Sequence, residues 1–120
     1  MHDPPRDIVE RTFEFALAIV ALCQECERRN GVARTLARQL LRSATSIGAN
    51  VEEAKAGQSR PDFISKYSIA LKEARETHYW LRLLAASETV PEERLLPLID
   101  EANQIVAILT TIVKKTRKKS

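Results

Sequence analysis

The chain has 120 residues, of which 44% are hydrophobic, and a formal net charge of +3. This length and apolar content predict one domain with one packed core, and they exclude disorder over most of the chain. No run of about 18 uninterrupted apolar residues occurs, and residues 1–6 are polar and contain proline, so we expect neither a membrane span nor a signal peptide. We therefore expect a cytoplasmic protein whose two cysteines are reduced.

The first predicted helix spans about 7–29, in a chain whose scarcity of glycine and proline favours helices. Asp7 follows two prolines and is suited to cap the N-terminus of this helix. Asn30 and Gly31 end it, with Gly31 suited to the left-handed conformation that closes many helices. Its apolar residues recur at the spacings of three and four that mark a buried face: Ile8, Phe15, Ala16, Ile19, Cys23 and Cys26.

The second and third predicted helices span about 33–55 and 61–86. Gly57 is a natural stop for the second, and Pro61 fits the first turn of the third, with Ser59 or Arg60 before it. The apolar face of the second helix consists of Leu36, Leu40, Ala44, Ile47 and Val51, flanked by Ala37, Leu41 and Gly48. That of the third consists of Phe63, Tyr67, Ala70, Leu71, Ala74, Leu81 and Leu84. A charged face lies opposite it: Lys66, Lys72, Glu73, Arg75, Glu76 and Arg82.

The fourth predicted helix spans about 91–113, and we expect Pro97 to bend its start rather than break it. Its apolar residues alternate at three and four as in a coiled-coil seam: Leu95, Leu98, Ala102, Ile105, Leu109 and Ile112. An additional apolar flank of Ile99, Val106 and Val113 predicts a contact between subunits, since one monomer core need not bury both flanks. Long helices joined by short loops predict an all-α fold, an antiparallel up-down-up-down four-helix bundle in a single domain over 1–120.

A basic tail follows this helix at 114–120, where five of the 19 basic residues lie: Lys114, Lys115, Arg117, Lys118 and Lys119. The 14 other basic residues face 16 acidic ones, so the rest of the chain is almost neutral. The favoured interpretation of the tail is a solvated helix end whose cations suit the helix dipole. Contact with nucleic acid or an anionic surface is the alternative.

No arrangement of residues predicts an enzyme, a metal site or a cofactor. Cys23 and Cys26 form a C-x-x-C late in a helix without a second ligand pair, so we interpret them as two packed thiols. A di-iron carboxylate site needs two Glu-x-x-His motifs, and the chain has none. His78 is favoured as a helix-face residue over a base or ligand. Glycine-rich phosphate loops are absent as well, and we expect no small-molecule substrate.

Three arginines, Arg34, Arg38 and Arg42, follow one another at a spacing of four along one edge of the second helix. Such a ridge can hold phosphates, with the basic tail as a second contact. It can equally be a solvated edge or pair with glutamates of a neighbouring helix or subunit. Direct RNA or DNA binding through these residues is therefore an alternative function rather than the leading one.

A polar stripe also runs along the second helix. Ser43, Ser46, Asn50 and Glu53 lie at spacings of three, four and three, which places them on one face. We expect Asn50, Glu53 and Glu76 to be partly buried and to form a hydrogen-bonded network that sets the register of the second and third helices. A ligand site is the weaker interpretation.

The run from Leu41 to Ala54 resembles the signature of a family of bacterial four-helix bundle proteins first noticed in intervening sequences of large-subunit ribosomal RNA genes. That signature is approximately an arginine, a small residue two positions later, and then Ser-Ile-x-x-Asn-x-x-Glu. It is matched by Arg42, Ser46, Ile47, Asn50 and Glu53, and further likenesses occur at Gly57, Ser59, Phe63, Ile69, Ala70 and Glu76. The chain departs from the family at Lys72 and Glu73, where Gly-Ser is frequent, which points to a subgroup.

The resemblance implies an up-down bundle that assembles into a homopentamer. Relatives of this family include the accessory protein of diversity-generating retroelements, which works with a reverse transcriptase and RNA. We therefore expect a non-enzymatic scaffold whose partners are further copies of itself and RNA, DNA or a nucleic-acid-handling protein.

Overall fold

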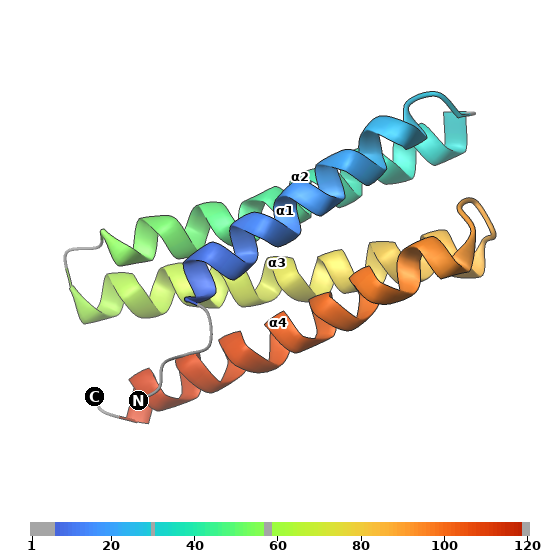
Figure 1. Ribbon diagram of the computed structural model, residues 1–120. Helices are drawn as coiled ribbons and strands as arrows, with labels where there is room; N and C mark the ends of the chain where they lie inside the picture. Colours follow the sequence, from blue (N-terminus) through green and yellow to red (C-terminus); the bar gives the residue numbers. More distant parts are fainter. Residues whose placement is uncertain (1–6, 30, 57–58, 119–120) are drawn as a thin grey trace.

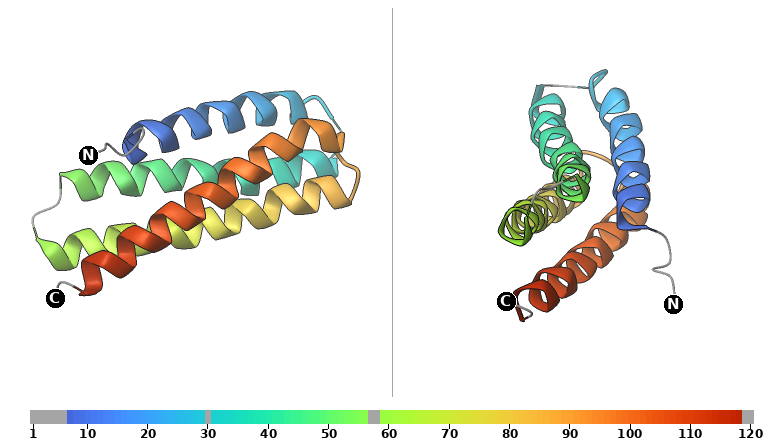
Figure 2. Two further views of the ribbon diagram at one scale, coloured as in Figure 1. Left: turned by 60° about the horizontal axis from the view of Figure 1, so that its bottom comes forward. Right: turned by 90° about the vertical axis from the view of Figure 1, so that its left-hand side faces the viewer.

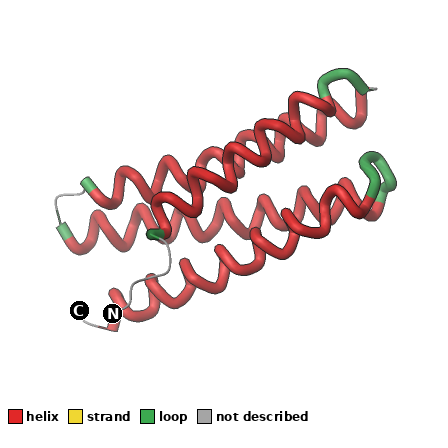
Figure 3. Tube along the Cα trace, in the orientation of Figure 1, coloured by secondary structure: helices red, strands yellow, loops and turns green. Residues whose placement is uncertain are grey.

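The computed structural model describes residues 7–29, 31–56 and 59–118, and all of its regular structure is helical (Figures 1 and 3). The helices are α1 (Ile8–Cys26), α2 (Gly31–Lys55), α3 (Arg60–Ala86) and α4 (Glu92–Lys118). Each runs opposite to the one before it (Figure 1). The predicted all-α antiparallel four-helix bundle is thereby confirmed.

Local capping sets two of the helix starts as the sequence indicates. Asp7 caps α1, its side chain accepting a hydrogen bond from the Val9 amide. Ser59 caps α3 in the same way through the Asp62 amide at 3.2 Å, and Pro61 lies in the first turn, where the missing N–H would have no partner. Gly57, the predicted stop of α2, and Asn30 lie outside the described residues.

The predicted boundary between the first two helices is wrong. The last helical residue of α1 is Cys26, and a tight turn follows in which the Arg28 and Arg29 amides donate to carbonyls three residues earlier. Gly31 is the first residue of α2, and no glycine among the described residues has positive φ, so it is not a left-handed cap. The turn at residues 27–29 therefore ends α1 earlier than the glycine signal predicts.

The predicted C-terminal boundary is also wrong, because α4 continues to Lys118 through Pro97 and through the basic residues. Lys and Arg are good helix formers, and their charge is favourable beside the negative C-terminal end of a helix dipole. Most of the predicted tail is thus the last turns of α4, whereas residues 119–120 are not described.

The four helices do not pack equally. α2 packs along α1 and α3, and α3 packs along α4, whereas α1 and α4 meet over a short stretch and diverge (Figure 2). Two ion pairs join α1 to α4 there: Arg11 Nε lies 2.6 Å from Glu101 Oε2, and Arg94 Nη1 lies 2.7 Å from Glu25 Oε1. The bundle is therefore held chiefly by its sequential helix pairs.

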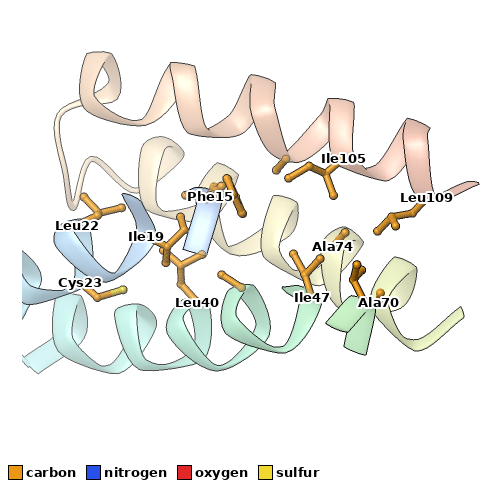
Figure 4. Packing of buried hydrophobic residues seen from close by; sticks show 14 of the residues in the cluster. Phe15, Ile19, Leu22, Cys23, Leu40, Ile47, Ala70, Ala74, Ile105 and Leu109 are labelled. Carbon is orange, nitrogen blue, oxygen red and sulfur yellow. The ribbon is translucent and has the colours of Figure 1, made fainter. Parts of the chain in front are cut away.

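A single core runs between the helices (Figure 4). Ile19 of α1, Leu40 and Ile47 of α2 and Ile105 of α4 are fully buried, opposite small residues of α3 such as Ala74. The apolar flank of α4 belongs to this core, since Val113 is buried while Ile99 and Val106 pack against it. Ile99 and Val106 are only partly buried, so the expected contact of this flank with another subunit stays a prediction.

By length and composition α4 could cross a membrane, with a mean hydropathy of 1.4 over its best 18-residue window, 22% of which is buried. In this structure the buried residues of α4 form an apolar stripe that faces the core. Asp100 and Glu101 lie outside that stripe, on the polar side of the helix. A spanning helix surrounded by lipid is apolar on all sides, so the pattern of α4 is that of a core helix.

Candidate interaction surfaces

The cysteine pair is part of the core. Cys23 and Cys26 are both buried and unbridged, and the Cys23 thiol donates a 3.3 Å hydrogen bond to the Ala37 carbonyl of α2. Burial raises the pKa of Cys23 to about 12 and also raises the pKa of Cys26. Both side chains are therefore neutral thiols at physiological pH. Among the described residues no cluster of three or more His, Cys, Asp or Glu side chains could hold a metal ion.

The arginine ridge of α2 has partners within the chain. Arg34 donates to the Arg29 carbonyl at 2.8 Å, and Arg38 forms a two-pronged pair with Glu27, each distance 3.2 Å. Arg42 pairs with two glutamates of α3. Arg38 and Arg42 thus each face glutamate carboxylates, which corresponds to the salt-bridge interpretation of the ridge, and both arginine side chains remain more than half exposed.

The basic end of α4 lies away from that ridge. Exposed side chains surround a shallow hollow of about 530 Å³ there, lined by Thr111, Lys114, Lys115, Arg117 and Lys118. Lys119 lies outside the described residues. Since α2 starts at one end of the bundle and α4 finishes at the other (Figure 1), the two predicted groups of nucleic-acid contacts are not brought together. Nucleic-acid binding by either group stays a prediction.

The polar stripe of α2 divides into separate contacts. Ser43 lies 2.8 Å from Thr77 Oγ1 of α3, with both residues buried. Within the part of the chain that the structure describes, Ser46 and Asn50 hydrogen-bond only inside α2, with the Asn50 amide donating to the Ser46 carbonyl at 2.9 Å. Glu53 pairs with Lys66 at 2.7 Å, but its side chain is 60% exposed, so the expected partial burial of Glu53 is wrong. The last turn of α2 points that carboxylate toward solvent.

A second contact between α2 and α3 was only partly foreseen. Glu76 is partly buried as expected, and it accepts from both Arg42 and the Trp80 indole N–H, the latter at 2.9 Å. Glu73 is buried and pairs with Arg42 at 3.4 Å, so its prediction on an exposed charged face is wrong. Glu73, Thr77 and Trp80 recur at spacings of four and three, a signal that could have placed them beside Glu76 on the face toward α2.

An apolar groove between α1 and α2 was not predicted. Two large side chains of α1 stand out beside it, Phe13 at 59% and Leu17 at 55% exposure. The groove has a volume of about 380 Å³ and is lined by Phe13, Ala16, Leu17, Val20, Thr45, Gly48, Ala49 and Glu52. Small side chains on the α2 wall leave room for an approaching helix. The clue in the sequence was Phe13 and Leu17, which share a face of α1 outside its predicted buried line.

Comparison with known proteins agrees with this architecture. The chain is similar to a crystal structure of a protein with unknown function from the S23 ribosomal protein family of Bacteroides thetaiotaomicron. The two are 40% identical, the match covers 90% of this chain and 99% of the other, and the TM-score is 0.81. A search of curated proteins gives no significant match. The family model described as 23S rRNA-intervening sequence protein matches residues 6–111, and the chain belongs to that family.

Proposed function

We propose that the protein is a non-enzymatic scaffold that assembles with further copies of itself, as a homopentamer, in the cytoplasm. The observation that carries the proposal is the α1–α2 groove, where Phe13 and Leu17 are exposed beside Gly48 and Ala49. Large apolar side chains next to a concave apolar wall are typical of surfaces that bind another protein. The number of subunits rests on the family resemblance.

A non-catalytic role is supported by the chemistry of the described side chains. Both cysteines are buried neutral thiols. Burial and the nearby Arg82 charge lower the pKa of His78, so its imidazole is neutral at physiological pH. Neither the thiols nor this imidazole lines the α1–α2 groove, which lacks the convergent ionisable groups of an active site.

The occupant of the groove is a second copy of the same chain. A helix inserted there covers Phe13 and Leu17, and the short, exposed side chain of Ala49 lets it approach closely. Fully burying a large apolar side chain contributes roughly 1.5–3 kcal/mol, and since Phe13 and Leu17 are 59% and 55% exposed, covering the rest of each contributes somewhat more than half of that. The groove therefore supplies a substantial part of a stable subunit contact.

Multi-angle light scattering of the purified protein tests the proposal. The expected result is a five-subunit mass for the native chain and a smaller mass for Leu17→Glu, which places a charge in the groove. Leu96→Glu is the matched control, because Leu96 is similarly exposed, at 51%, on α4. A native chain that is monomeric at micromolar concentration contradicts assembly, and an unchanged mass for Leu17→Glu contradicts the groove as its site.

A further inference from the structure

One face of α3 carries a regular line of polar and basic residues. Ser68, Lys72, Arg75, Tyr79 and Arg82 follow one another at spacings of four, three, four and three, so they share one side of the helix. From Lys72 to Arg82 this line extends about 15 Å. Its three cations are all exposed.

The C-terminal end of α4 extends this line. The Arg117 guanidinium donates to Ser68 Oγ at 3.4 Å, which sets the last turns of α4 beside the start of the line on α3. Lys114 lies one turn before Arg117 and Lys118 on α4. We call the exposed cations of these two helices the α3–α4 basic face: Lys72, Arg75, Arg82, Lys114, Arg117 and Lys118.

No carboxylate compensates this face. Between Phe63 and Ala86 the acidic residues are Glu73 and Glu76, and both turn toward α2, where they pair with Arg42. The last acidic residue of α4 is Glu101, which pairs with Arg11 of α1. Within residues 7–29, 31–56 and 59–118, no cation of the α3–α4 basic face forms an ion pair.

An aromatic ring stands among these cations. Tyr79 lies between Arg75 and Arg82 on the line, is 51% exposed, and holds its ring edge-on to Trp80 at 5.1 Å. Its phenol makes no hydrogen bond within the described residues. An exposed aromatic side chain between cations offers a surface on which a base can stack while the cations contact phosphates.

We propose that the α3–α4 basic face binds single-stranded nucleic acid, with Tyr79 stacking on a base and the six cations contacting the phosphate backbone. The repeated charge of a polynucleotide matches a line of cations one helical turn apart. An unpaired base can stack on the exposed ring of Tyr79, whereas a duplex keeps its bases stacked on one another. The proposal does not depend on self-assembly, which uses the groove between α1 and α2.

Fluorescence anisotropy with a labelled 20-nucleotide single-stranded RNA tests this inference. The face variant is Lys72→Gln/Arg75→Gln/Arg82→Gln. The matched control is Arg28→Gln/Arg38→Gln/Lys55→Gln, which removes the same charge from exposed sites elsewhere. Circular dichroism and light scattering of each variant establish equal folding and equal mass.

We expect the native chain and the control to bind alike at about 50 mM salt, and the face variant to bind at least about tenfold more weakly. Its plot of log K against log salt should be less steep by about 2, because each phosphate contact to a single strand contributes about 0.7. Tyr79→Ala should weaken binding by roughly 5- to 150-fold, as loss of one stacked base does, while Tyr79→Phe restores it.

Four results would overturn the inference. The first is absence of RNA binding by the native chain at low salt. The second is an equal loss of RNA affinity in the face variant and the control, which means that affinity depends on net charge alone. The third is a loss confined to the control, which assigns binding to the α2 ridge through Arg38. The fourth is binding to phosphatidylserine vesicles or to duplex RNA in preference to the single strand.

Discussion

The buried hydroxyl pair between α2 and α3 allows a quantitative test of how this bundle sets its register. Ser43 and Thr77 lie 2.8 Å apart, while Thr77 also contacts the Glu73 carbonyl at 2.8 Å and Ser43 the Leu40 carbonyl at 3.2 Å. Two hydroxyl protons serve these three contacts. Since the Thr77–Glu73 distance is the shorter of the two carbonyl contacts, the Thr77 proton belongs there, and the Ser43 hydroxyl donates to Thr77.

Ser43→Ala removes the one side-chain hydrogen bond that a described residue donates to Thr77, and it leaves the Thr77 proton on the Glu73 carbonyl of its own helix. The cost is therefore that of one hydrogen bond without a stranded donor, about 0.5–1.5 kcal/mol in the free energy of unfolding. Thr77→Val, which keeps the shape of the side chain, removes the acceptor and should cost a similar amount. The double variant should cost less than the sum of the two, with a coupling of about 1 kcal/mol.

Urea unfolding of the native chain and the three variants at one protein concentration measures this coupling, since assembly makes stability depend on concentration. Each loss of about 1 kcal/mol corresponds to a fall in Tm of about 4 °C for a chain of this size. Ser46→Ala is the control, because among the described residues the Ser46 hydroxyl hydrogen-bonds to Asn50 of its own helix and to no residue of α3. Strictly additive losses from the two single variants would refute a hydrogen bond between the helices.

The local geometry at Gly48, Glu88 and Cys23 gives further predictions. Gly48→Ala should raise the free energy of unfolding by roughly 0.5–1 kcal/mol in thermal unfolding, because alanine is favoured over glycine inside a helix. The added methyl group fits, since it meets Thr12 Oγ1 at 3.5 Å, an ordinary contact. A loss of stability would show that α1 and α2 are packed more tightly. Glu88 has a φ of 58°, so Glu88→Gly should raise the Tm and Glu88→Val should lower it; equal Tm values would contradict strain in this turn. With its pKa raised from 9.0 to about 12, Cys23 should resist a thiol reagent at pH 8 until the chain unfolds, and rapid reaction of the folded protein would argue against its burial. Because the unfolded thiol ionises first, stability should fall as pH rises from about 9 toward 12, and a flat pH profile would oppose this.

Helical periodicity and capping residues in the sequence were sufficient to locate the helices and most of the core. Spacings of three and four placed Ile19, Leu40 and Ile47 on buried faces, and all three are fully buried. Capping chemistry set the starts at Asp7 and Ser59 correctly, because a cap depends on residues within one turn of it. The ends of α1 and α4 were misplaced, since residues that continue a helix and residues that leave it differ little in propensity.

Which polar groups meet depends on how the helices pack and could not be predicted from the sequence. Helical spacing puts Glu73 on one side of α3 but does not say whether α2 or solvent lies there, and it proved to be α2, with Arg42 as the partner. The same packing turns both glutamates of α3 away from Lys72, Arg75 and Arg82, leaving those cations uncompensated. It also leaves Phe13 and Leu17 outside the core although their hydrophobicity equals that of buried residues. The spacing of residues along a helix determines the direction in which each side chain points around that helix. Whether a charge is neutralised or a side chain is buried depends on which residues of the neighbouring helix lie within a few ångströms.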